Sequence, residues 1–326
     1  MYDVICIGSA TVDVFAHTDR SELIKIMDAH SEETLLAYPS GSKIIITELD
    51  FTIGGGGTNT STAFARLGKK TAFLGRLGCD QNSEQVLAFL EIEGIDFVGQ
   101  RGEIMGGYSI ILDSIEHDRT ILTYKGANNN LEYGKLDKTK FKTEWYYFCS
   151  MMERSLKSME ALAIYARRHK SRIAFNPSAY LARQGLKSIN RILKYTSLLV
   201  LNCEEAEMLV GKDEMPGLLK RLHKYVPLVV ITDGKKGAWA YDGKTMYHAA
   251  AHDIKVVECT GAGDAFGSTF LWGMMEKDDI SFALKAATTN AESVLRHHGA
   301  KNNLATKGKL SAALKRRPVK VTKSKI

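Results

Sequence analysis

The chain has 326 residues, of which 44% are apolar and 25% charged, enough for one large α/β domain with a well-buried core. Its five cysteines are scattered, without a C-x-x-C pair or a neighbouring histidine cluster. This pattern excludes a zinc site and a disulfide framework, and indicates reduced thiols in the cytoplasm. No apolar stretch approaches the ~20 residues of a membrane span, and the first residues lack the basic region of a signal peptide.

The formal net charge of +7 resides at the C-terminal end. Residues 309–326 contain seven Lys or Arg residues and no acidic residue, so the rest of the chain is close to neutral. Such basic tails are most often solvated. We therefore expect one domain over residues 1–302 and a basic appendage over 303–326, with no nucleic-acid or membrane partner. Nucleic-acid binding through the tail remains an alternative, and it would show a steep salt dependence.

Short β-branched runs alternate with longer helical patterns along most of the chain. This alternation is typical of βαβ units, in which helices cover both faces of a mainly parallel sheet. Strands are expected at residues 2–8, 71–75, 145–150, 172–176, 197–202 and 228–234. Helices are expected at residues 58–68, 81–93, 155–170, 181–195, 203–211, 215–224, 261–276 and 280–297.

Two strand-rich stretches interrupt this alternation where helices would be expected. Residues 42–53 and 106–126 both read as strands, and the second pattern predicts a hairpin that turns near 116–118. Together with residues 13–17, we expect them to form a small sheet outside the main one. That sheet would lie over the active edge of the main sheet as a lid.

The segment "FTIGGGGTNTSTAFARLG" (51–68) follows a predicted strand and opens a predicted helix. Glycines there permit positive φ and let a ligand approach the backbone, while the helix start offers free N–H groups. The segment is neither a Walker A loop nor a G-x-G-x-x-G fingerprint. A tight strand-to-helix turn and a ligand-binding loop both remain open.

The segment "ECTGAGDAFG" (258–267) offers the same geometry with one added carboxylate. The backbone amides of Gly261, Ala262 and Gly263 can form an anion hole at a helix start. Asp264 would then lie beside the hole as a candidate base for a hydroxyl, or it would only stabilise the helix N-terminus. Two glycine-rich helix starts in one α/β chain can bring a phosphoryl donor and an acceptor together at the carboxyl ends of the strands.

The two glycine-rich motifs resemble the signatures of the ribokinase (PfkB) family of carbohydrate kinases. The first signature is matched by Gly57, Asn59, Ser61, Gly68 and Gly78, and the second by "TGAGDAF". Four segments between them resemble family segments in the family's order: "YKGANNNL" (124–131), "FNPS" (175–178), "NCEEAEML" (202–209) and "ITDGKKGAWAY" (231–241). The resemblance covers roughly residues 3–300, and an ordered set of motifs is more specific than any single one.

The resemblance implies a ribokinase-like α/β fold with a small β lid and transfer of the γ-phosphate of ATP to a sugar or nucleoside hydroxyl. Asp264 would be the catalytic base, beside an anion hole of the Gly261, Ala262 and Gly263 amides. The acceptor would be faced by Asp13, Gly55, Gly56 and Asn59. The nucleotide would contact Asn202, Thr232, Gly234, Gly237 and Asn290. Glu205, with Asn202, would order Mg²⁺ through water, because Mg²⁺ gives up its waters reluctantly.

The chain departs from the family pattern at two informative positions. Glu258 stands where the second signature usually has an Asp that helps to hold a monovalent cation, so dependence on potassium is left open. Gly56 stands where several members have a Lys that can meet a substrate phosphate, which favours a ribose-like or nucleoside acceptor. A hexose or phosphosugar kinase and an inactive ligand-binding protein remain alternatives. A homodimer through an open lid edge is also compatible with the sequence.

Overall fold

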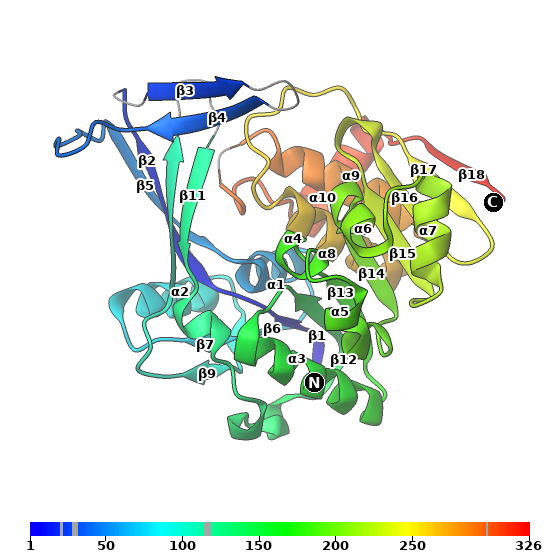
Figure 1. Ribbon diagram of the computed structural model, residues 1–326. Helices are drawn as coiled ribbons and strands as arrows, with labels where there is room; N and C mark the ends of the chain where they lie inside the picture. The colour runs from blue at the N-terminus through cyan, green and yellow to red at the C-terminus, as the bar shows by residue number, and fades with distance from the viewer. Residues whose placement is uncertain (20–21, 28–31, 114–118, 298) are drawn as a thin grey trace.

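A ten-stranded sheet forms the centre of the molecule in the computed structural model, which describes residues 1–19, 22–27, 32–113, 119–297 and 299–326 (Figure 1). Seven neighbouring strands are parallel, in the spatial order β8 (Asp96–Phe97), β6 (Thr71–Leu74), β1 (Tyr2–Ile7), β12 (Thr143–Cys149), β13 (Arg172–Asn176), β14 (Leu198–Asn202) and β15 (Leu228–Thr232). Three antiparallel strands extend this sheet: β16 (Ala238–Tyr241), β17 (Met246–Ala249) and β18 (Val321–Ser324). The predicted mainly parallel sheet is therefore confirmed.

Helices cover both faces of the main sheet, as the βα alternation predicted. Strand β12 shows why, because Tyr146 and Phe148 point into one apolar core while Trp145 and Tyr147 point into the other. The first core is covered by α3 (Glu153–Arg168), α4 (Ala179–Ala182), α5 (Leu186–Leu193), α6 (Cys203–Val210) and α7 (Met215–His223). The second is covered by α1 (Gly56–Arg66), α8 (Ala262–Lys277), α9 (Ile280–Val294) and α10 (Lys307–Arg316).

A separate four-stranded sheet projects from the main domain (Figure 1). Its order is β11 (Arg119–Tyr124), β10 (Gly107–Asp113), β2 (Thr11–His17) and β5 (Glu48–Gly54). The predicted strand over 42–53 begins only at Glu48, and the predicted turn near 116–118 lies outside the described residues. A hairpin that the sequence did not predict, β3 (Glu22–Met27) and β4 (Glu32–Ala37), lies between β2 and β5 along the chain.

The strand register gives the small sheet two different faces. Val14 pairs with Phe51 and with Ile110, so these residues share an apolar face, whose inner part packs against α2 (Gln81–Ile92). Asp13 is opposite Ser109, and both lie on the other face, which is more polar. Because β2 continues from β1 through residues 8–10, this polar face adjoins the carboxyl end of the main sheet.

The cysteines were expected to be reduced thiols, and no membrane span was expected. All five cysteines are free thiols; Cys6 and Cys149 are buried, whereas Cys79 and Cys259 are exposed. Within the described ranges, no helix has the length and apolar character needed to cross a membrane.

The prediction of a solvated C-terminal appendage is wrong. Residues 307–316 form α10, and β18 adds an edge strand beside β17. Leu310 and Val319 are buried in the second core. The net charge concealed these apolar residues, because lysine and arginine side chains can cover a packed segment while their charged ends stay in water.

We expect Leu310→Ala to lower the free energy of unfolding by about 2–5 kcal/mol, as is usual for truncation of a buried leucine. Thermal and denaturant unfolding would measure the loss. The matched control is Lys309→Ala, an exposed position of the same helix, which should change stability by no more than about 0.5 kcal/mol. Equal effects of the two substitutions would contradict the packing of α10.

Candidate active site

The starts of helices α1 and α8 meet at the centre of the molecule. Each is preceded by a glycine with positive φ, Gly55 (φ 92°) and Gly261 (φ 76°). A Cβ at Gly55 would lie 2.5 Å from the Ser9 carbonyl oxygen, and one at Gly261 would lie 2.6 Å from the Ala300 Cα. Both positions therefore require glycine for conformation and for space.

A hydrogen bond joins the two helix starts. In the first turn of α1, Asn59 Nδ2 donates to Asp264 Oδ2 in the first turn of α8 at 2.8 Å. Gly56 is also close, because a Cβ at that position would be 3.6 Å from Asp264 Oδ1. The two glycine-rich motifs, about two hundred residues apart in the chain, thus form one site.

Two pockets adjoin this junction, and Asp264 and Asn176 line both. The first pocket is formed by the ends of β14 and β15 and the start of α8, with lining residues Asn176, Val200, Leu201, Asn202, Glu205, Thr232, Gly261, Gly263 and Asp264. The second lies by the start of α1 and the end of β12, with lining residues Ser9, Gly56, Lys125, Asn128, Asn129, Cys149, Ser150, Met151, Met152, Asn176, Ser178, Tyr180 and Asp264. One carboxylate thus stands between two ligand-sized spaces.

Burial makes the Asp264 carboxyl a better proton acceptor than an ordinary aspartate. Desolvation raises its pKa to about 6, against the opposing effects of the Asn59 hydrogen bond and the nearby charge of Lys301. A carboxylate with a pKa near 6 is ionised at neutral pH and still basic enough to take a proton from a reacting hydroxyl.

The start of α8 offers backbone N–H groups to the first pocket. Among the described residues, the N–H groups of Gly261, Gly263 and Asp264 have no protein acceptor. The Ala262 N–H, in contrast, donates to the Cys259 carbonyl at 3.3 Å, and Ala262 does not line the pocket. The backbone N–H groups open to a ligand in this pocket are therefore those of Gly261, Gly263 and Asp264.

Asn202 and Glu205 form a capping box and also line the first pocket. Asn202 Oδ1 accepts from the Glu205 N–H (2.8 Å), and Glu205 Oε2 accepts from the Asn202 N–H (3.0 Å). Burial raises the pKa of Glu205 to about 7, and the charge of Asp264 adds to this rise. A cation in the pocket would relieve both effects.

The donor set around Glu205 fits Mg²⁺ held partly by water and phosphate. The described ranges contain no group of three or more His, Cys, Asp or Glu residues placed to hold a metal. Mg²⁺ in kinase sites is commonly bound by one or two carboxylates plus substrate phosphates, so such a cage is not required. Glu205 is the carboxylate that could contribute here.

The other residues assigned to the nucleotide separate into two groups. Thr232 lines the first pocket. Gly234 and Gly237 belong to the turn between β15 and β16 and do not line it. Asn290 is fully buried, where its amide donates to Thr269 Oγ1 (2.8 Å) and accepts from the Ala305 N–H (2.9 Å). Asn290 therefore ties the C-terminal segment to α9 and α8, and it does not line the first pocket.

The four residues assigned to the acceptor differ in their relation to the second pocket. Gly56 lines the pocket, and Gly55 shapes the turn before it. Asp13 lies on the polar face of the small sheet, and its buried Oδ1 has no hydrogen-bond partner among the described residues. Asn59, however, uses both ends of its amide within the protein, since Nδ2 bonds to Asp264 and Oδ1 accepts from Lys301 Nζ at 2.6 Å.

Sequence reasoning assigned no role to three residues that the structure places at the site. Asn176 ends β13, within the segment "FNPS", and its Nδ2 donates to the Val200 carbonyl at 2.7 Å. Lys125, from "YKGANNNL", lines the second pocket with its Nζ 5.0 Å from the Tyr180 ring centre. Both lie in motifs that were noticed, whereas nothing in the sequence marked the buried Lys301.

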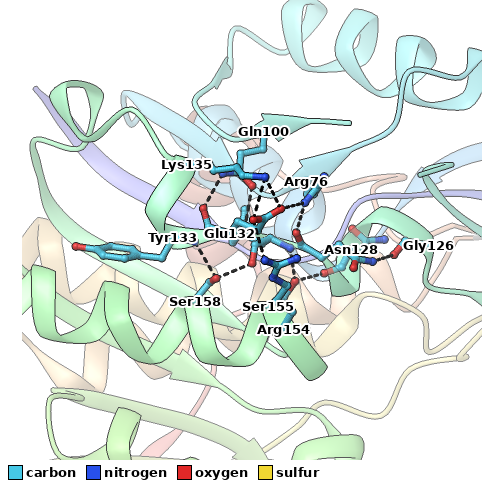
Figure 2. Close-up of polar contacts among 12 residues, drawn as sticks. Arg76, Gln100, Gly126, Asn128, Glu132, Tyr133, Lys135, Arg154, Ser155 and Ser158 are labelled. Atoms are coloured by element: carbon cyan, nitrogen blue, oxygen red, sulfur yellow. Dashed lines mark hydrogen bonds and ion pairs between the residues drawn. The ribbon is translucent and has the colours of Figure 1, made fainter. Parts of the chain in front are cut away.

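The loop that contains Lys125, Asn128 and Asn129 forms one wall of the second pocket. A charged network holds this loop in place (Figure 2). Glu132 accepts from Arg76 (3.0 Å) and from Arg154 (2.9 Å), and Lys135 lies 3.1 Å from the same carboxylate. On α3, Ser155 Oγ donates to the Asn128 carbonyl at 2.6 Å. Because Lys125, Asn128 and Asn129 belong to this loop, the network holds pocket residues in place without entering the pocket.

Glu258 also has a structural contact in the protein. Its buried carboxylate accepts a hydrogen bond from the Gly299 N–H at 2.7 Å. This bond ties the segment before α8 to the turn that contains Ala300 and Lys301.

Known proteins resemble this chain in sequence and in fold. The model of the pfkB family of carbohydrate kinases matches residues 1–307. The chain is 29% identical over 244 residues to an uncharacterised sugar kinase of Archaeoglobus fulgidus, covering 74% of this chain and 97% of that one. The fold is similar to that of the Methanocaldococcus jannaschii nucleoside kinase (TM-score 0.79, 21% identity, 97% and 99% covered). It is also similar to that of Arabidopsis thaliana ribokinase complexed with ribose and ATP (TM-score 0.82, 19% identity, 96% and 99% covered). The chain belongs to the pfkB family of carbohydrate kinases, which are phosphotransferases with an alcohol group as acceptor.

Proposed function

We propose that this sugar or nucleoside kinase transfers the γ-phosphate of ATP to a hydroxyl of a ribose-like or nucleoside acceptor, with Asp264 as the catalytic base. The observation that carries the proposal is the position of Asp264 between the two pockets. ATP would occupy the pocket beside β14, β15 and α8, and the acceptor would occupy the pocket beside α1 and Lys125. The five free cysteines support a reducing compartment such as the cytoplasm.

Each group at the junction has a defined task in this proposal. The amides of Gly261, Gly263 and Asp264 stabilise charge on the transferring phosphoryl group. Such charge stabilisation, together with positioning, supplies most of the catalysis in phosphoryl transfer. Asp264 takes the proton from the acceptor hydroxyl. Glu205 would help to hold Mg²⁺, which, when bound, neutralises charge on the phosphates. Thr232 and Asn202 line the nucleotide side.

The lining of the acceptor pocket supports a polyhydroxylated ligand. Ser9, Ser150 and Ser178 offer uncharged polar groups. The buried, unpartnered Oδ1 of Asp13, whose carboxylate interacts with the pocket residue Lys125, would accept a hydrogen bond from an acceptor hydroxyl that reaches it. A sugar or nucleoside hydroxyl can donate a hydrogen bond to a serine hydroxyl or to a carboxylate, and it can also accept one from a serine hydroxyl.

ATP consumption with a panel of pentoses, hexoses, their phosphate esters and nucleosides tests the acceptor class. We expect the highest kcat/KM with ribose or a nucleoside. The highest value with a hexose or a phosphosugar would support the corresponding alternative. Binding of these ligands without ATP consumption would support an inactive binding protein, contrary to the proposal.

We expect Asp264→Asn to lower kcat by about two orders of magnitude or more, because a positioned base contributes ~10²–10⁴-fold. The KM for ATP and the melting temperature should change little, since asparagine preserves the shape of the side chain. Steady-state kinetics and thermal unfolding of one variant measure these quantities. A modest loss of stability with near-normal turnover would instead identify Asp264 as a helix-capping residue.

We expect kcat/KM to rise with pH through the interval from about 6 to about 7. The pKa of Asp264 is raised to about 6 and that of Glu205 to about 7, so both carboxyls are protonated below the interval and ionised above it. In Glu205→Gln the rise should shift toward pH 6. A wild-type profile that is flat between pH 5 and 7 would contradict the assignment.

We further propose a homodimer through the apolar face of the small sheet. In support, Phe51 and Leu122 lie on that face and are 59% and 53% exposed. Phe51→Lys should convert a dimer into a chain of about 36.1 kDa in light-scattering measurements. The matched control is Ile164→Lys, an exposed apolar residue of α3, which should leave the mass unchanged. A monomeric wild-type protein would refute this proposal.

A further inference from the structure

Lys301 lies in the turn between α9 and α10, yet its side chain points into the active-site junction. It is 7% exposed. Its Nζ donates to three oxygens: the Ile53 carbonyl, Thr58 Oγ1 (3.1 Å) and Asn59 Oδ1 (2.6 Å). Lysine is almost never buried without partners, and here all three donors of the ammonium group are used.

We propose, on the basis of the proposed kinase function, that Lys301 is a positioning residue that orients the Asn59 amide and thereby holds the Asp264 carboxylate toward the acceptor pocket.

The chemistry of the donors gives this chain of contacts a direction. An ammonium group only donates, so the atom of Asn59 that faces Lys301 must be the amide oxygen. The amide nitrogen then points to Asp264 Oδ2 at 2.8 Å. Asp264 Oδ1 has no hydrogen-bond partner in the described part of the chain and lies on the side of Gly56, which lines the acceptor pocket. The free oxygen of the base therefore faces the acceptor.

The charges around Lys301 favour this arrangement on balance. Asp13 on β2 and Asp264 on α8 stabilise the ammonium charge, as does Glu93 beyond the end of α2, whereas Arg66 on α1 opposes it. Burial has the largest effect and lowers the pKa of Lys301 to about 7. Burying the Lys301 ammonium group costs desolvation free energy, and an apolar side chain of similar length often packs as stably. The lysine therefore indicates a role other than packing.

The charged and titratable groups facing Asp264 come from several elements. Lys301 lowers the pKa of Asp264, as does the Asn59 hydrogen bond. Glu205 on α6 is the nearby acidic group, and the buried side chains of β1 and β12 that interact with Asp264 are Cys6, Tyr147 and Cys149. Lys301 is thus the cation that favours the ionised base.

The turn that carries Lys301 is anchored without its ammonium group. Arg66 Nη1 donates to the Lys301 carbonyl at 2.9 Å, and the Gly299 N–H is bound by Glu258. Gly261 packs against Ala300. A change confined to the end of the Lys301 side chain should therefore leave the fold in place.

Lys301→Met removes the charge and the donors while keeping the length of the side chain. We expect kcat to fall by about ten- to a hundredfold, the scale typical of a misplaced catalytic group, with little change in the KM for ATP. The pH midpoint of kcat/KM should move upward, because Asp264 loses its cation. Lys307→Met is the matched control, since Lys307 is an exposed lysine paired with Glu276 away from the pockets; it should behave as wild type.

A double-mutant cycle tests whether Lys301 acts through Asn59. If it does, Asn59→Leu combined with Lys301→Met should be no slower than Asn59→Leu alone. Independent, multiplicative losses would overturn the proposal and make Lys301 a direct ligand of substrate. A folded Lys301→Met variant with wild-type kcat and an unmoved pH midpoint would also overturn it.

Two further measurements keep the proposal testable if a variant misfolds or if turnover is absent. Lys301→Gln retains a donor for Asn59 but has no charge, so its pH midpoint should move upward with a smaller loss of kcat. Carbon-13 titration of the Asp264 carboxyl should show a higher pKa in either variant than in wild type, and needs no turnover. Wild-type inactivity toward every acceptor would refute the proposed function alone, whereas an unchanged Asp264 titration would refute the role of Lys301.

Discussion

The site depends on keeping one carboxylate ionised where it is poorly solvated. Asp264 must lie away from bulk water to stand between two pockets, and desolvation alone would favour its protonated form. Three devices act against this cost: the dipole at the start of α8, the Asn59 amide and the charge of Lys301. Each comes from a different part of the chain, so the central carboxylate requires all of these parts to meet.

Much of the remaining architecture brings these parts of the chain together around Asp264. The parallel strands bring their carboxyl ends, and with them Asn176, Asn202 and Thr232, to one edge of the sheet. The small sheet turns its polar face toward the same edge and carries Asp13. Around Glu132, the charged network holds the loop that forms one wall of the second pocket (Figure 2). These elements are far apart in sequence, so the site exists only in the folded chain.

Periodicity and glycine placement made the central parts predictable. The parallel strands are short runs of β-branched and aromatic residues, and Gly55 and Gly261 stand where the backbone needs positive φ, so local chemistry revealed them. The segment after α9 was not predictable in this way. Net charge suggested a solvated tail, but the burial of Leu310 and of Lys301 depends on long-range packing against the second core and α1. The burial of Asn290 was not predictable for the same reason, because its family position does not reveal that its amide is buried.

The charges around the second pocket bear on whether the proposed acceptor carries a phosphate, which Gly56 had argued against. The absence of a lysine at position 56 does not leave the pocket without cations, since Lys125 lines it and Lys301 lies behind it. Both lysines, however, interact with the carboxylate of Asp13, and Lys301 also interacts with that of Asp264. Two cations thus balance two carboxylates. A phosphate on the acceptor would add negative charge to a balanced and partly buried site, where uncompensated charge is costly. This balance supports the proposed neutral acceptor more strongly than the missing lysine does.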